Sequence, residues 1–295
     1  MQSARAKSAR VAGFTLIELS IVLVIIGLIV GGVLVGQDLI RAAYVRAQIS
    51  QIEKYNTAVN TFRGKYNALP GDLNQATAST YGFAARGQYA GEGDGNGIIE
   101  GTYNDQANQN YGYVEYGGET AAFWVDLSSN VAGNLIDGGF KTASLTGDGS
   151  SASAPITGTV LGNWFPSAKL GNGNYIYVWS LGGINYYGLS AVTAIEVGGN
   201  GGDLDSDKNI SVTTAYNIDK KVDDGFPYTG RVLTMYLTPA RGTWTDGVGP
   251  STPSNITPSS STCIDTAGLW SSNPTYSTNY NSGAAGNCAL SFKFQ

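Results

Sequence analysis

The feature that most constrains this chain is a long apolar run near its N-terminus. Residues 1–13 (MQSARAKSARVAG) are polar and basic, and residues 14–36 are almost wholly apolar. At 1.5 Å per residue, a helix over this run is about 35 Å long, enough to cross a hydrocarbon core of about 30 Å. A cleaved secretory signal has a shorter apolar stretch, of roughly 7 to 15 residues. We therefore predict one membrane-spanning helix that stays on the mature protein, with the basic leader on the cytoplasmic side.

One carboxylate interrupts the apolar run. Glu18 lies about one helical turn into it, where a charge costs roughly 2.5 to 3.5 kcal/mol on translocon scales. A charge at this depth needs a partner. Cleavage between Gly13 and Phe14 would create an α-amino group one helical turn from Glu18, and the amine of a neighbouring copy could then pair with the carboxylate. Glu18 is thus predicted to act in assembly.

The string GFTLIE at residues 13–18, after a short basic leader and before an apolar helix, resembles the class III signal of type IV pilins and type II secretion pseudopilins. The resemblance implies that prepilin peptidase cleaves after Gly13 and methylates the amine of Phe14, and that Glu18 guides subunit registration in a filament. It also implies the other partners: further copies of this chain, other pilins and an inner-membrane assembly platform. The expected location is a single pass in the inner membrane before assembly, and a periplasmic or extracellular filament afterwards.

Four segments are expected along the chain: a cleaved leader at 1–13, a transmembrane or filament-core helix at 14–37, an amphipathic continuation of that helix at 38–67, and a globular head at 68–295. The continuation rests on apolar residues spaced mostly by three, four or seven. They are Val45, Ile49, Ile52, Val59, Phe62 and Tyr66. Gln48 and several charged residues lie between these positions, and Pro70 marks the end of the helix.

The sequence of the head predicts short strands between turns rich in Gly and Asn. The expected fold class is therefore α+β, with a long N-terminal helix packed on a C-terminal antiparallel β-sheet head, as in pilins. Residues 174–181 (NYIYVWSL) and 184–191 (INYYGLSA), separated by two glycines, predict a hairpin. Helices are expected at about 119–135 and 213–222, and another strand at 231–237. Residues 243–261 are expected to form an irregular exposed loop.

The two cysteines of the chain, Cys263 and Cys288, lie near the C-terminus without any Cys-x-x-Cys pairing or histidine nearby. A single disulfide, formed in an oxidising compartment, is the favoured interpretation, and two separate buried thiols are the alternative. The pair also resembles the disulfide-bounded loop that closes many type IV pilin heads.

Residues 94–100 (DGNGIIE) resemble part of an EF-hand-type calcium loop, in which oxygens at alternate positions face one ion. Asp94, Asn96 and Glu100 would supply side-chain oxygens, and Ile98 its carbonyl. Tyr103 stands where the distal bidentate glutamate would be. A plain Asn-Gly turn is the alternative interpretation, and both remain open.

A second alternation of carboxylates lies at residues 203–207. Asp203, Asp205 and Asp207 would repel one another unless a cation or solvent screens them. Lys208 replaces the usual glycine of a calcium loop, and Thr214 the usual glutamate. A calcium site and a solvated acidic loop are both open here, so calcium is an optional ligand and no cofactor is expected to be essential.

Composition excludes several classes of function. The chain has no histidine, the commonest general base, so a serine–histidine catalytic pair cannot form. Its net charge of −5 argues against tight nucleic-acid binding. We therefore expect a structural subunit of a type IV pilus or type II secretion pseudopilus and not an enzyme. The alternative is a minor pilin at the filament tip whose head binds a ligand or acts as an adhesin.

Overall fold

The computed structural model describes residues 13–86, 93–101, 111–112, 118–140, 155–195, 204–238, 241–246, 259–265 and 274–294. The chain divides into two compact units, residues 1–43 and 44–295. Helix α1 (Leu16–Tyr66) belongs to both, since it begins in the first unit and ends in the second.

In the first unit, α1 carries an apolar surface without cover. The large apolar side chains between Phe14 and Ile40 are exposed, Leu16 to 89%. Within the described part of the chain, α1 is the one helix long and apolar enough to cross a membrane. Burying such a surface in lipid or against other apolar helices would remove it from water.

In the second unit, one face of α1 is buried in the head. The buried residues are Val45, Gln48, Ile52, Tyr55, Ala58, Val59, Phe62 and Tyr66. Their spacing confirms the amphipathic pattern, with one correction: Gln48, which the pattern places among the polar residues, is fully buried. An amide can be buried when it is hydrogen-bonded, and Gln48 Oε1 accepts the backbone N–H of Leu170 at 3.3 Å.

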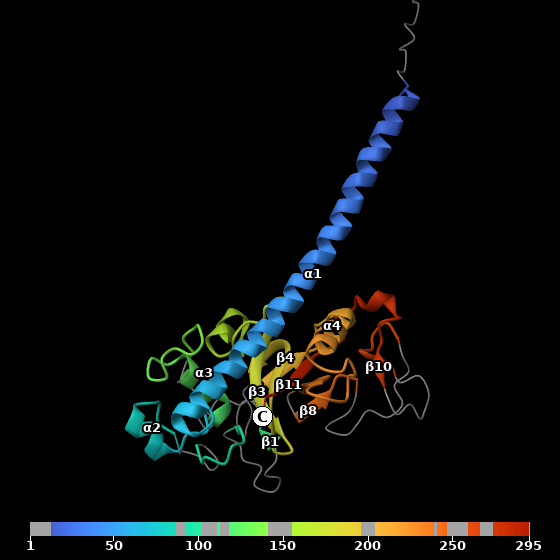
Figure 1. Ribbon diagram of the computed structural model, residues 1–295. Coiled ribbons are helices and arrows are strands. Elements are labelled where there is room, and N and C mark those ends of the chain that lie inside the picture. The colour runs from blue at the N-terminus through green and yellow to red at the C-terminus, as the bar shows by residue number, and fades with distance from the viewer. Residues whose placement is uncertain are drawn as a thin grey trace, which may run out of the picture. The chain divides into compact units, whose positions relative to one another are not determined.

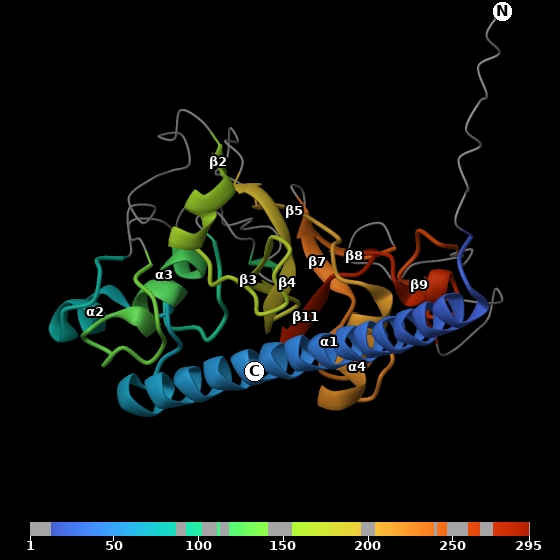
Figure 2. The ribbon, with the colours of Figure 1, turned by 90° about the horizontal axis from the view of Figure 1, so that it is seen from above.

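The head is built on an antiparallel sheet of seven strands, in which β4 is central (Figure 1). Its strands are β1 (Tyr111–Gly112), β2 (Ile156–Thr157), β3 (Asn174–Leu181), β4 (Ile184–Ile195), β5 (Leu204–Asp207), β6 (Val232–Leu233) and β11 (Leu290–Lys293). The main order is β1-β3-β4-β11-β6, and β2 and β5 also pair with β4. Figure 2 shows β3, β4 and β11 side by side.

The predicted hairpin is confirmed. Leu181 pairs with Ile184 across a two-residue turn, and Gly182 and Gly183 both have positive φ, +59° and +77°. A two-residue turn with positive φ at both positions is type I′, whose twist matches that of the flanking strands. The second strand runs further than predicted, to Ile195, because it gains new partners in β2 and β5.

Two small sheets and several helices complete the head. The sheets pair β7 (Met235–Thr238) with β8 (Arg241–Trp244), and β9 (Ile264–Asp265) with β10 (Thr275–Tyr276). The helices are α2 (Gln75–Tyr81), α3 (Gly118–Ser128) and α4 (Val212–Val222), with the short 3₁₀-helices η2 (Gly158–Asn163) and η3 (Asn281–Gly283). The prediction of a helix at 213–222 is confirmed.

Three sequence-based boundaries are wrong. The helix expected at 119–135 ends at Ser128, and it could not continue to 135, because Gly133 and Asn134 both have positive φ. The strand expected at 231–237 is split at Thr234, since β6 pairs with β11 whereas β7 pairs with β8. The loop expected at 243–261 begins inside β8, and its residues 247–258 lie outside the described part of the chain.

Aromatic side chains join α1, α3 and the sheet in one core. The ring of Tyr55 lies 5.0 Å from that of Trp124 and 6.2 Å from that of Tyr187. Tyr187 in turn stacks on Phe294 at 4.3 Å. The second part of the long helix is thus packed on the sheet, and the molecule has the α+β pilin-like architecture that the sequence predicts.

Candidate functional site

The peptide bond between Gly13 and Phe14 lies in a short non-helical segment just before α1. Both residues are exposed, Phe14 to 82%. A Cβ added at Gly13 would meet no atom within 4 Å, so the fold itself does not require glycine here. A requirement for glycine would have to come from an enzyme that recognises this bond.

Glu18 is hydrogen-bonded to Thr15, the residue that precedes α1. Its Oε2 accepts the backbone N–H and the hydroxyl of Thr15, both at 2.8 Å. The Thr15 hydroxyl oxygen accepts the backbone N–H of Glu18 at 3.3 Å. This reciprocal pattern is a capping box, which satisfies the free N–H groups of the first helical turn. The spacing Thr-x-x-Glu signals this motif in the sequence, and the charge of Glu18 alone does not reveal it.

In the head, the structure brings Asp94 together with two carboxylates that the calcium-loop pattern does not contain. One oxygen each of Asp72, Asp94 and Glu119 lies within 4.8 Å of the others. Asp72 and Glu119 are buried, whereas Asp94 is exposed. We call these three residues the carboxylate cluster. No periodic pattern in the sequence links these three positions, so the cluster has no direct signal in the sequence.

The two buried carboxylates fasten the loop that carries Asp94. Asp72 accepts the N–H of Gly95 with Oδ1 at 2.8 Å and that of Gly97 with Oδ2 at 2.9 Å. Glu119 accepts the N–H of Gly93 with Oε1 at 2.7 Å and that of Glu100 with Oε2 at 3.0 Å.

Burial and mutual repulsion disfavour the charged forms in the cluster. Burial raises the pKa of Asp72 to about 6. The hydrogen bonds from the N–H groups of Gly97 and Gly95 lower this pKa, whereas the charge of Asp94 raises it. Burial, and then the charge of Asp72, also raises the pKa of Glu119 well above its usual value. A proton or a cation between the carboxylates would relieve the repulsion.

Asn96 and Glu100, the other predicted calcium ligands of this loop, have different roles. Asn96 donates its backbone N–H to Asp94 Oδ1 at 2.9 Å, and its own Oδ1 accepts the N–H of Ile98 at 2.6 Å. These are the bonds of successive Asx turns. Burial, followed by the charge of Asp94, raises the pKa of Glu100. The turn is therefore present, and calcium at this loop stays a prediction.

The second predicted calcium loop is not a loop where it is described. Asp205 and Asp207 lie on strand β5, opposite Ala194 and Ala191 of β4, and Asp203 lies outside the described residues. The expectation of a loop is wrong for 204–207, because pairing with β4 extends the chain. Asp205 and Asp207 belong to neither of the carboxylate groups found in the described part of the molecule.

The other carboxylate group lies at the C-terminal end of α4 and consists of Asp219, Asp223 and Asp224. Asp219 is fully buried, and its Oδ2 accepts the hydroxyl of Tyr276 at 2.7 Å. Burial raises the pKa of Asp219 to about 7, although the hydrogen bonds from Tyr276 and from the Gly225 N–H lower it. Asp224 Oδ1 accepts the N–H of Phe226 at 2.9 Å, which is the bond of an Asx turn.

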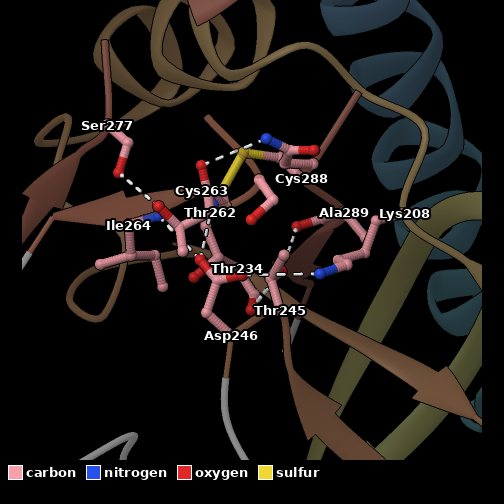
Figure 3. A network of polar contacts seen from close by, with 12 residues as sticks. Lys208, Thr234, Thr245, Asp246, Thr262, Cys263, Ile264, Ser277, Cys288 and Ala289 are labelled. Carbon is pink, nitrogen blue, oxygen red and sulfur yellow. Dashed lines mark hydrogen bonds and ion pairs between the residues drawn. A yellow bond between two sulfur atoms is a disulfide. The ribbon is translucent and has the colours of Figure 1, made fainter. Parts of the chain in front are cut away.

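The predicted disulfide is present, between Cys263 and Cys288, both fully buried (Figure 3). Asp246 holds the same region, since its Oδ2 accepts the N–H groups of Cys263 at 2.5 Å and Ile264 at 2.8 Å. Its Oδ1 lies 3.6 Å from the ammonium of Lys208. This network ties the C-terminal segment to the end of the sheet.

Comparison with known proteins identifies the N-terminal segment. Residues 8–34 match the family model of the prokaryotic N-terminal methylation motif. The match covers the exposed Gly13–Phe14 bond, the capping box and most of the apolar run. No curated protein and no solved structure matches the chain.

Proposed function

We propose that this chain, whose residues 8–34 carry the signature of the prepilin-type signals of type IV pilins and pseudopilins, is a structural filament subunit of a type IV pilus or type II secretion pseudopilus. Prepilin peptidase cleaves it after Gly13 and methylates Phe14. It then leaves the inner membrane and polymerises with its own copies or with other pilins on an assembly platform.

The observation that carries the proposal is the order of features along the first 40 residues. An exposed Gly–Phe bond is followed by a capped helix start and then by apolar side chains exposed on all sides of α1. Such a helix is suited first to lipid and then to a bundle of identical helices, because both environments bury its whole circumference. The matched motif belongs to structural subunits and not to enzymes, so the proposed role of the chain is to build the filament.

Intact-mass and N-terminal analysis of the protein from sheared cell-surface material tests the proposal. We expect a chain that begins at N-methylated Phe14 and is abundant in that fraction. A processed chain found only in membranes would restrict the role to a minor pilin or a pseudopilin. A chain that is uncut in both fractions would overturn the proposal.

The variant Gly13→Leu provides the control for processing. Since no atom lies within 4 Å of a Cβ at this position, the substitution should not disturb the fold. We expect this variant to enter the membrane with an intact disulfide, to remain uncut and to be absent from the sheared fraction. Normal cleavage of Gly13→Leu would contradict processing at this bond.

A further inference from the structure

The head contains a cavity of about 530 Å³ beside the second part of α1. One wall consists of Gln51, Lys54 and Tyr55 of α1, and the opposite wall is formed by residues 137–140 and 165–169. All of these residues belong to the second unit of the chain. Small-molecule sites in proteins commonly have volumes of about 300 to 1,000 Å³, so the cavity is large enough for a ligand of one or two rings.

The cavity walls are held in place by contacts between distant segments. Gln51 Nε2 donates to the carbonyl of Ser167 at 3.0 Å and to the hydroxyl of Tyr55 at 2.9 Å, while its Oε1 accepts the N–H of Lys169 at 3.1 Å. Lys54 is hydrogen-bonded to Asp137 at the mouth. The bonds of Gln51 join α1 to Ser167 and Lys169, whereas the exposed Lys54–Asp137 pair adds little to the stability of the facing wall.

Aromatic rings supply flat apolar surfaces in the cavity. Tyr55 and Phe165 are buried and Phe140 is half-buried, and all three contribute to the lining. The ring of Trp124 backs this wall, since it lies 5.0 Å from the ring of Tyr55 and 6.2 Å from that of Phe140. Because Tyr55 is 6% and Phe165 3% exposed, the half-buried ring of Phe140 presents the larger accessible surface against which the C–H groups of a ligand can pack.

The charge of the cavity is opposite to that of the chain. Lys54 and Lys169 outnumber Asp137 in the lining, although the chain as a whole carries −5. Within the described residues, Lys54 forms an ion pair with Asp137, whereas Lys169 is exposed and acts on Asp137 through its charge alone. The ammonium group of Lys169 is therefore available to a negatively charged ligand.

We propose that this cavity binds a saccharide that carries a carboxylate, such as a uronic acid. A pyranose ring has apolar C–H faces and polar hydroxyl edges, which matches rings interleaved with Asp137, Lys54 and Ser167. The carboxylate would pair with Lys169, because a charge-assisted hydrogen bond is stronger than a neutral one. A purely apolar ligand would leave the charged groups unpaired, and a small inorganic anion would leave the rings without contact. The proposal does not depend on whether the chain polymerises.

Titration calorimetry on the detergent-solubilised full chain tests this site with two probes, glucuronic acid and glucose. We expect saturable binding of glucuronic acid and weaker binding of glucose. Lys169→Gln should weaken glucuronic acid binding about tenfold, the factor expected for one lost charge-assisted hydrogen bond, and leave glucose binding unchanged. Phe140→Ala should weaken the binding of both sugars. Lys221→Gln, on the exposed surface of α4, is the control and should bind as the unchanged chain does.

Three results would overturn the inference. One is no saturable binding of either sugar at up to about 10 mM, above the millimolar range of weak complexes. Another is a Lys169→Gln variant that binds glucuronic acid as well as the unchanged chain. The third is equal weakening by Lys169→Gln and Lys221→Gln, which would indicate attraction by net charge and not by this cavity. Equal melting temperatures of the variants would show that they are folded.

Discussion

The carboxylate of Glu18 accepts hydrogen bonds from Thr15, the residue just before the first residue of its own helix. Glu18 Oε2 accepts two hydrogen bonds of 2.8 Å from Thr15, one from the backbone N–H and one from the hydroxyl. Glu18 thus has two separable properties, its charge and its role in the capping box. Substitutions can distinguish them, because glutamine also completes a capping box whereas alanine does not.

Glu18→Ala is expected to impair filament assembly and to leave membrane insertion intact. Glu18→Gln keeps an acceptor for Thr15 but loses the charge, so it should keep the start of α1 and still assemble poorly if pairing with an amine drives assembly. Thr15→Ala, which loses about 1 kcal/mol of capping but keeps the charge, is the matched control and should assemble better. Sheared and membrane fractions measure both effects. Normal filaments from Glu18→Ala would refute the pairing.

Calcium should stabilise the head through the carboxylate cluster, because a cation relieves the repulsion among Asp72, Asp94 and Glu119. We expect a higher melting temperature with calcium than with a chelator at neutral pH. Asp94→Asn should abolish the difference. Glu53→Gln, which changes an exposed carboxylate of α1 outside the cluster and outside both predicted calcium sites, should preserve it. Identical melting with calcium and chelator would count against both predicted calcium sites.

Asp219 should make the stability of the head depend on pH. Burial raises its pKa to about 7, above the value of about 3.9 for an unfolded chain. The folded state then binds more protons between about pH 4 and pH 7, so stability falls as the pH rises through this window. Asp219→Asn should remove this loss and gain on the order of 1 to 3 kcal/mol at pH 8. Melting curves from pH 4 to 8 measure it, and equal slopes for both proteins would contradict the assignment.

The buried ion pair between Arg86 and Asp126 should be sensitive to the loss of one partner. Both side chains are fully inaccessible to solvent, and Asp126 Oδ2 also accepts the N–H of Gly71 at 2.7 Å. Asp126→Ala leaves a buried charge unpaired and should destabilise the head by about 3 to 5 kcal/mol. The double variant Arg86→Met with Asp126→Ala should lose less than the sum of the losses of the two single variants. Denaturation of the four proteins forms a double-mutant cycle, in which additive losses would show that the pair is not coupled.

The disulfide should resist reduction until the head unfolds, because both cysteines are fully buried. Replacing both cysteines by serine should cost about 3 kcal/mol for a loop of this length. Thiol labelling after treatment with a reductant measures accessibility under native and denaturing conditions. Rapid labelling of the native protein would contradict the burial of this bond.

Features that depend on neighbouring residues were predictable from the sequence alone. The apolar run of α1, the signal around Gly13 and the hairpin at Gly182 arise from local composition and spacing, so a short window contains the whole pattern. The disulfide was predictable because the chain has two cysteines only.

Tertiary structure decided the features that join distant residues. Asp94 lies beside Asp72 and Glu119, and no periodic pattern links these three positions. Gln48 lies in the buried face of α1, where Leu170, far along the chain, donates a hydrogen bond to its Oε1. Asp205 and Asp207 became strand residues through pairing with β4. The sequence by itself thus determined the helix, its processing signal and the fold class, whereas the cluster, the cavity and the strand boundaries arose from long-range contacts, whose energies outweigh local preference.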